Sequence, residues 1–159
     1  PGQVGELAQR VSSLMLGYHN APALTETALD GDGWYYTGDL AVSDEKGFIR
    51  IVGRKKDMVI RGGQNIFPAE VERFVLGLDG VRNAAAVGRP HSVLGESLWL
   101  FVEIEEGAAW TAESLLAHCR EQLAPAKRPD HVKILDSLPV TASGKVRKFL
   151  LKDMDISDE

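Results

Sequence analysis

Residues Gly53 to Glu72 read GRKKDMVIRGGQNIFPAEVE, and this stretch decides how the rest of the chain is interpreted. It opens with a charged link, Arg54–Asp57, which is followed by Met58–Ile60, a short run of residues that favour β-strands. Gly62-Gly63 then allows a tight turn, because glycine accepts positive φ, and Asn65–Phe67 resumes the extended run. The stretch therefore predicts a charged link followed by a β-hairpin.

A helix is predicted directly after the hairpin. Pro68 suits its first position, where the missing N–H of proline is no loss. Apolar residues then recur at the i, i+3, i+4, i+7 spacing of one helical face: Val71, Phe74, Val75 and Leu78. Because composition changes across the charged link, we expect two parts, residues 1–54 and residues 55–159, with a hinge at residues 54–57.

Helical and extended patterns alternate after the hinge. Extended runs are predicted at Val81–Val87, Ser97–Glu105 and His131–Leu135, with a loop over Gly88–Glu96. Helices are predicted from Thr111, a candidate N-cap, to about Leu123, and over Lys145–Met154. This alternation predicts a small compact α/β sandwich.

The first 53 residues have a different pattern, of β structure broken by turns. We expect a strand pair within Gly5–Leu16, a strand over Trp34–Val42 interrupted at Thr37–Asp39, and a hairpin whose turn is Asp44–Gly47. A small isolated sheet is marginal in water, so this segment is expected to be the β-rich trailing edge of a larger N-terminal domain. The overall fold class is therefore α+β, and an opening proline in place of methionine also indicates a piece of a longer protein.

Composition excludes several classes of protein. The chain has 159 residues, 44% of them hydrophobic, and a net charge of −5, which argues against general affinity for nucleic acid. No apolar run approaches the ~18 residues of a transmembrane helix, and no secretory leader is visible, so a cytoplasmic protein is expected. The single cysteine, Cys119, is predicted to be a buried core thiol, and the four scattered histidines do not predict a metal site.

Three segments carry a resemblance to a known family. They are Tyr35–Leu40 (YYTGDL), Gly53–Glu72, and Leu138–Lys145 (LPVTASGK). In this order and spacing they resemble the adenylate-forming enzymes, which include acyl-CoA synthetases, the adenylation domains of peptide synthetases, and luciferases. The resemblance covers nearly the whole chain but only the final third of such an enzyme. It implies an acid–thiol ligase that uses ATP with Mg²⁺, CoA and a carboxylic acid.

The resemblance implies nucleotide-binding roles for three residues before the hinge. Asp39 by itself is typical of a self-capping turn, but it matches the aspartate that binds the ribose of ATP and AMP in the family, a task that suits two acceptor oxygens. Ile51 matches a residue that lines the base and ribose pocket. Arg54 matches an arginine that hydrogen-bonds the ribose.

Residues from Lys56 onward match the hinge and the CoA-binding turn of the family. Lys56, by itself typical of a solvated lysine, matches the hinge residue about which the small domain rotates. Gly62 and Gly63, by themselves a hairpin turn, match the glycines that let the pantetheine arm of CoA pass the backbone. Arg61 is a further candidate for contact with CoA phosphates.

Lys145 is the candidate catalytic residue. A lone Gly-Lys pair is weak, and the phosphate-loop pattern fails because position 139 is proline and position 146 is valine. The resemblance matches Lys145 to the lysine that reaches the active site during adenylation and stabilises charge as pyrophosphate leaves. Lys148 stands where the family often has arginine.

The function that the resemblance implies is the C-terminal part of an ATP-dependent acyl-CoA ligase. The phosphate loop and acyl pocket, which the family carries upstream, are missing, so this chain alone is expected to be inactive, and acetate, fatty, aromatic and alicyclic acids remain open. Two alternatives are an adenylation domain that loads a carrier protein and a non-catalytic interaction domain of the same fold.

Overall fold

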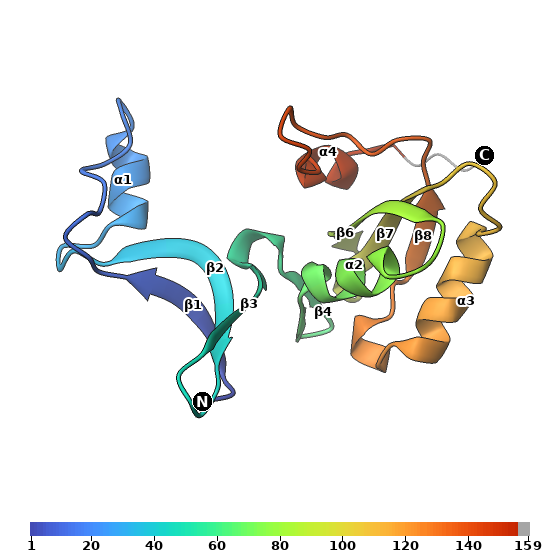
Figure 1. Ribbon diagram of the computed structural model, residues 1–159, viewed down its shortest axis with the longest axis horizontal. Helices are drawn as coiled ribbons and strands as arrows, with labels where there is room; N and C mark the ends of the chain where they lie inside the picture. Colours follow the sequence, from blue (N-terminus) through green and yellow to red (C-terminus); the bar gives the residue numbers. More distant parts are fainter. Residues whose placement is uncertain (156–159) are drawn as a thin grey trace. The chain divides into compact units, whose positions relative to one another are not determined.

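The computed structural model describes residues 1–155, and the chain divides between Lys56 and Asp57 into two compact units (Figure 1). The first unit is a three-stranded antiparallel sheet in the order β1-β2-β3 with one helix. Its elements are β1 (Val4–Gln9), α1 (Pro22–Ala28), β2 (Tyr35–Ser43) and β3 (Ile49–Arg54). The hydrophobic side chains buried in this unit are few, namely Leu40, Ala41 and Val52.

Two expectations for the first unit are wrong and one needs refinement. Residues 5–16 form one strand, β1, followed by turns, and not a strand pair. Residues 22–28 form α1, which begins with Pro22 and buries no residue, so no apolar periodicity marked it. Strand β2 runs without a break through Thr37–Asp39, but its pairing with β1 shifts register there and Gly38 has a φ of +73°.

The turn between β2 and β3 forms as expected. The Asp44 carboxylate accepts hydrogen bonds from the Lys46 and Phe48 N–H groups, each at 2.9 Å. Gly47 supplies a φ of +84°, which glycine adopts without strain. The hairpin brings Asp39 in β2 into register with Arg54 in β3.

The second unit contains a mixed sheet in the order β5-β4-β7-β6, with β8 pairing parallel to β7. Its strands are β4 (Val59–Arg61), β5 (Gln64–Ile66), β6 (Val81–His91), β7 (Gly95–Ile104) and β8 (His131–Ile134). Its helices are α2 (Pro68–Leu76), α3 (Ala112–Gln122) and α4 (Lys148–Lys152), with 3₁₀ turns η1 (Lys55–Asp57), at the boundary of the two units, and η2 (Pro125–Lys127). This arrangement is the α/β sandwich expected from the sequence.

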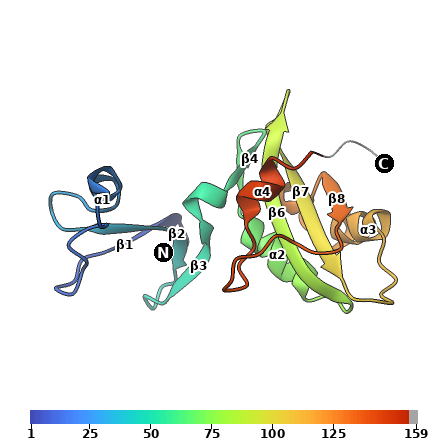
Figure 2. The ribbon, with the colours of Figure 1, turned by 90° about the horizontal axis from the view of Figure 1, so that it is seen from above.

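Alternation along β6 and β7 gives this sheet two buried faces. Even-numbered side chains such as Ala86 and Leu100 pack with α2 and α3, while odd-numbered ones such as Val87 and Phe101 pack with Leu138 and Leu151. In Figure 2, α2 and α4 lie on opposite sides of β6. Each face is therefore covered by a different part of the chain.

The residues predicted to start the helices α2 and α3 are confirmed in those positions. Pro68 is the first residue of α2, and Thr111 caps α3, its hydroxyl accepting from the Ser114 N–H at 3.2 Å. Helix α4 is shorter than expected, because residues 139–147 form a hydrogen-bonded hairpin instead. The expected loop over residues 88–96 is also wrong, since β6 continues to His91 and β7 begins at Gly95.

Cys119 lies in the core of the second unit, as predicted. It is fully buried on α3, and desolvation raises the pKa of its thiol to about 11. The side chain therefore behaves as a small hydrophobic residue. Within residues 1–155, every helix is too short or too polar to cross a lipid bilayer.

Candidate functional site

Asp39 and Arg54 form an ion pair on neighbouring strands of the first unit. The Arg54 Nε lies 2.7 Å from Asp39 Oδ1, and the two side chains are 54% and 27% exposed. The Asp39 N–H donates to Thr37 Oγ1 at 3.0 Å, and the Thr37 hydroxyl donates to the Leu7 carbonyl at 2.8 Å. Two residues that the family resemblance matches to ribose contacts thus touch each other, and the carboxylate is accessible to solvent.

Ile51 lies on β3 with its side chain exposed, opposite Ala41 of β2. An exposed isoleucine on a sheet is an apolar surface against which a flat ring can pack. The structure therefore places Asp39, Ile51 and Arg54 on two paired strands, although only Asp39 and Arg54 make a direct contact.

Tyr35, at the start of β2, has a raised pKa. The main cause is a hydrogen bond with the Tyr18 side chain, and the charge on Asp39 adds to it, while Arg54 lowers it. The shift therefore reinforces the neutral form of the phenol and does not change its charge at ordinary pH.

Lys56 lies in η1, the 3₁₀ turn at the boundary between the units, and its side chain is exposed. Neighbouring Lys55 pairs with Glu6 of β1, with 2.6 Å between Nζ and Oε2. This ion pair holds Lys55, near the end of the first unit, against the sheet of that unit.

Gly62 and Gly63 form the two-residue turn between β4 and β5. Their φ angles are +57° and +80°, which a type I′ hairpin requires and which glycine adopts without strain. The Gly62 N–H donates to the Leu94 carbonyl at 2.8 Å, whereas a Cβ on Gly63 would meet no atom within 4 Å. The backbone at Gly63 is open to the approach of a ligand.

Arg61 is engaged by acceptors within the protein, and its contact with CoA phosphates stays a prediction. Its Nη1 donates to the Arg128 carbonyl and to Asp130 Oδ2, both at 2.8 Å. Its Nη2 donates to the carbonyls of Pro125, at 3.2 Å, and Ala126, at 2.9 Å. The side chain is only 13% exposed, so the guanidinium holds η2 and the residues after it in place.

Lys145 lies on the hairpin of residues 139–147 and its side chain is exposed. Thr141 organises this hairpin: its N–H donates to the Lys145 carbonyl at 2.8 Å, and its Oγ1 accepts from the Lys145 N–H at 3.1 Å. The Arg147 N–H donates to the Pro139 carbonyl at 2.7 Å and closes the base of the hairpin. The arrangement presents an ammonium group to solvent on an ordered support.

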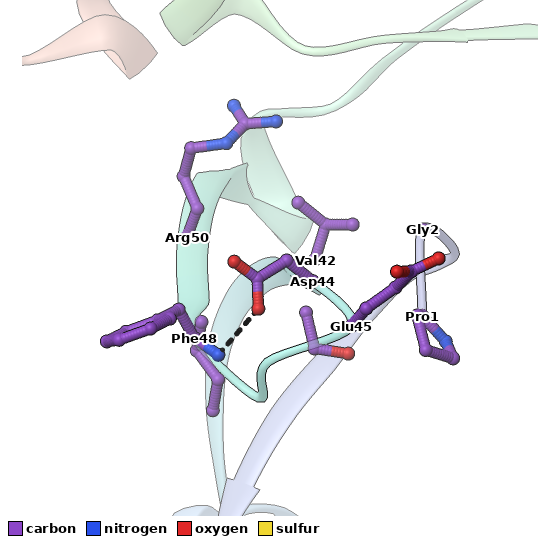
Figure 3. Close-up of a pocket in the computed structure, with 9 residues that line it drawn as sticks. Pro1, Gly2, Val42, Asp44, Glu45, Phe48 and Arg50 are labelled. Atoms are coloured by element: carbon purple, nitrogen blue, oxygen red, sulfur yellow. Dashed lines mark hydrogen bonds between the residues drawn. The ribbon is translucent and has the colours of Figure 1, made fainter.

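Two surface cavities have linings that contain none of the predicted nucleotide-binding, hinge, glycine-turn or catalytic residues. One, of about 590 Å³, lies beside the β2–β3 turn and includes Asp44, Phe48 and Arg50 (Figure 3). The other, of about 430 Å³, is lined by Arg61 together with Arg120 and His131. Among residues 1–155, no cluster of acidic, histidine or cysteine side chains has the makeup of a metal site.

Sequence reasoning did not predict the ion pairs of the second unit, among them one that links two helices. Glu72 of α2 and Lys148 of α4 form an ion pair, with 2.7 Å between Oε1 and Nζ. The two residues are far apart in the sequence and neither stands in an unusual local pattern, so no sequence signal linked them.

Comparison with known proteins gives consistent matches along the chain. Residues 70–145 match the family model of the AMP-binding enzyme C-terminal domain. The chain is 44% identical over 153 residues to the long-chain-fatty-acid–CoA ligase of Escherichia coli O157:H7, covering 96% of this chain and 27% of that protein. It is 41% identical over 149 residues to the human mitochondrial medium-chain acyl-CoA ligase, covering 94% and 24%.

Solved structures agree with these matches. The o-succinylbenzoate CoA synthetase of Bacillus subtilis, in complex with its acyl-adenylate intermediate, superposes with a TM-score of 0.87 at 33% identity. The match covers 98% of this chain and 31% of that one. The chain therefore spans about a quarter to a third of the length of the relatives it matches.

Proposed function

Because residues 70–145 belong to the AMP-binding enzyme C-terminal domain family, we propose that the chain is the C-terminal portion of an ATP-dependent acyl-CoA ligase. The first half-reaction joins a carboxylate to the α-phosphorus of ATP and releases pyrophosphate. In the second, the CoA thiol attacks the acyl carbon and AMP leaves.

Lys145 is the residue proposed to act in the first half-reaction. The observation that carries this role is the exposure of Lys145 on a hairpin ordered by Thr141 and closed by Arg147. An ammonium group carried on an ordered backbone can stabilise charge that builds on the phosphate oxygens. Mg²⁺ accompanies ATP and is bound outside the described residues.

The Gly62-Gly63 turn is proposed to act in the second half-reaction. Its support is the open space at Gly63, which leaves room for the pantetheine arm against the backbone. Between the two steps the second unit reorients about Lys56, so that the Lys145 hairpin leaves the reacting atoms and the glycine turn reaches them. The relatives reported above are named CoA ligases or synthetases, which favours free CoA over a carrier protein.

Asp39, Ile51 and Arg54 are proposed to contact the nucleotide. The Asp39 carboxylate suits the two hydroxyls of a ribose, and Ile51 offers an apolar surface to the base. The phosphate loop and the acyl pocket are proposed to lie in the part of the relatives that this chain does not span, so the chain alone is inactive.

The Lys145→Ala variant of the complete enzyme tests the central role. It is expected to slow acyl-adenylate formation by about 10²–10³-fold, because a charge-stabilising donor is lost. It should leave thioester formation from supplied acyl-adenylate near the wild-type rate. Pyrophosphate release measures the first step and acyl-CoA production measures the second.

Lys46→Ala is the matched control, since Lys46 is also an exposed lysine in a hairpin turn. It should leave both half-reactions unchanged. Equal loss of both half-reactions in Lys145→Ala would contradict the assigned role. Full activity in that variant would instead favour a non-catalytic interaction domain.

A further inference from the structure

The hairpin that carries Lys145 is held to the second unit at both of its ends, and Val146 within it packs against the odd-numbered face of the sheet. Leu138 before it and Leu151 after it are both buried in the odd-numbered face of the sheet. On the near side, the Leu138 N–H donates to Glu103 Oε2 at 3.2 Å. On the far side, the first ion pair after Lys145 is made by Lys148, three residues further on. Apolar packing and the Lys148 ion pair therefore hold the hairpin together, and the ion pair is the polar side-chain contact nearest to Lys145 on the far side.

The partner of Lys148 is itself fixed to the sheet. Glu72 Oε1 lies 2.7 Å from Lys148 Nζ and also accepts a hydrogen bond from the Ala86 N–H at 2.7 Å. Ala86 belongs to β6, the last strand on its side of the sheet, so this N–H points to Glu72 rather than to another strand. A carboxylate held by backbone gives the lysine a stationary target.

The ion pair joins elements on opposite faces of the sheet. Glu72 comes from α2 on one face and Lys148 from α4 on the other. The pair meets at the edge strand β6, where Glu72 also accepts from Ala86. The Lys148 and Glu72 side chains are only 21% and 15% exposed, so salt and water screen the pair less than a surface pair. The geometry fixes α4, and with it the base of the Lys145 hairpin.

We propose that Glu72 and Lys148 are positioning residues for Lys145, acting in the adenylation half-reaction and not in thioester formation. This inference rests on the proposed function of Lys145. Neither residue needs to touch a substrate. Because a displacement of about 1 Å can slow a reaction by about 10²-fold, losing the pair has a kinetic effect without loss of the fold.

The test compares Lys148→Met, Lys148→Arg and Glu72→Gln in the complete enzyme. Lys148→Met is expected to lower kcat for acyl-adenylate formation by about 10–100-fold with little change in the KM for ATP, because positioning and not binding is lost. Thioester formation from supplied acyl-adenylate should stay unchanged. Lys148→Arg, which keeps the charge and reach, should restore most of the rate.

A second measurement does not depend on activity. Hydrogen exchange of the amides in residues 139–147 should be faster in Lys148→Met than in wild type, and Lys148→Arg should restore protection. Glu72→Gln keeps an oxygen that accepts from Ala86 and removes only the charge, so it should behave like Lys148→Met. It takes the place of Lys148→Met if that variant fails to fold.

Lys127→Met is the matched control, because Lys127 pairs at 3.0 Å with Glu70 on the same helix α2 but lies in η2 and not in the hairpin. It should change neither measurement. Wild-type exchange in Lys148→Met, or an equal loss of both half-reactions, would overturn the inference. If the wild-type enzyme forms no acyl-adenylate with any acid, the proposed function fails, while the exchange data still decide whether the pair holds the hairpin.

Discussion

At the scale of the residue, Arg61 has a structural role that its sequence position did not indicate. Its guanidinium donates to three carbonyls and to Asp130, and the Asp130 carboxylate also accepts from the Leu98 N–H at 2.7 Å. The planar fork of arginine is suited to several fixed acceptors at once. Arg61 therefore joins β4, η2 and the start of β8 into one body.

Arg61→Met is expected to destabilise the second unit by about 2–3 kcal/mol, because hydrogen bonds to a charged group are lost and Asp130 keeps a charge without its partner. Arg61→Lys should recover only part of this, since an ammonium group cannot reach both sets of acceptors. Urea denaturation measures the free energy of unfolding. A loss below about 0.5 kcal/mol, typical of a surface site, would contradict the structural role of Arg61.

Local capping chemistry could be predicted at single residues, whereas charge pairs could not. Pro68 and Thr111 act within their own helix turn, so a short window of sequence contains the whole cause. The pairs Asp39–Arg54 and Glu72–Lys148 depend on which strands and helices meet, and a single sequence does not contain that information. Sequence alone therefore found candidate residues but not their contacts.

At the scale of the element, the Gly62-Gly63 turn makes a sharp prediction. Gly63→Leu is expected to lower thioester formation by about tenfold or more while acyl-adenylate formation changes little, because the side chain fills space that CoA needs. Both half-reactions are measured as for Lys145→Ala.

Gly107→Leu controls for backbone strain in this experiment. Gly107 has a φ of +82°, close to the +80° of Gly63, and a Cβ at either position would meet no atom within 4 Å. Both substitutions therefore place a side chain in the same disfavoured backbone region. If Gly107→Leu slows the thioester step as much as Gly63→Leu does, a role for Gly63 in admitting CoA is refuted.

There are physical reasons why the sequence did not predict the full length of β6 or the helix α1. Gly88 and Pro90 indicated a loop, yet both lie in β6, where an edge strand tolerates proline. A Cβ at Gly88 would come within 2.5 Å of Glu96 Oε1, so this glycine makes room for a cross-strand side chain and does not end the strand. Helix α1 lacks a buried face, and only Pro22 at its start marked it.

At the scale of the whole molecule, the two units differ in the size of their hydrophobic cores. The second unit has two clusters of buried hydrophobic side chains, one on each face of its sheet. The first unit buries only a few such side chains within residues 1–56. Composition and periodicity were enough to predict the α/β sandwich of the second unit, because its strands and helices alternate along the chain.

The 159-residue chain by itself is expected to release no pyrophosphate with any of a panel of acetate, fatty, aromatic and alicyclic acids. The physical reason is that the proposed nucleotide contacts of Asp39, Ile51 and Arg54 lie on two strands only and provide no enclosure for the triphosphate. A coupled pyrophosphate assay gives the measurement, with the complete enzyme as the positive control. Sustained turnover by the chain alone would refute this expectation.

The ion pair between Asp39 and Arg54 has a consequence for the proposed contact with a ribose. The guanidinium restricts the torsions of the carboxylate, so that part of the ordering entropy is lost during folding and not during association. On the role proposed for Asp39, Arg54 would strengthen binding of the sugar through rigidity alone, before any hydrogen bond of its own to the ligand is counted.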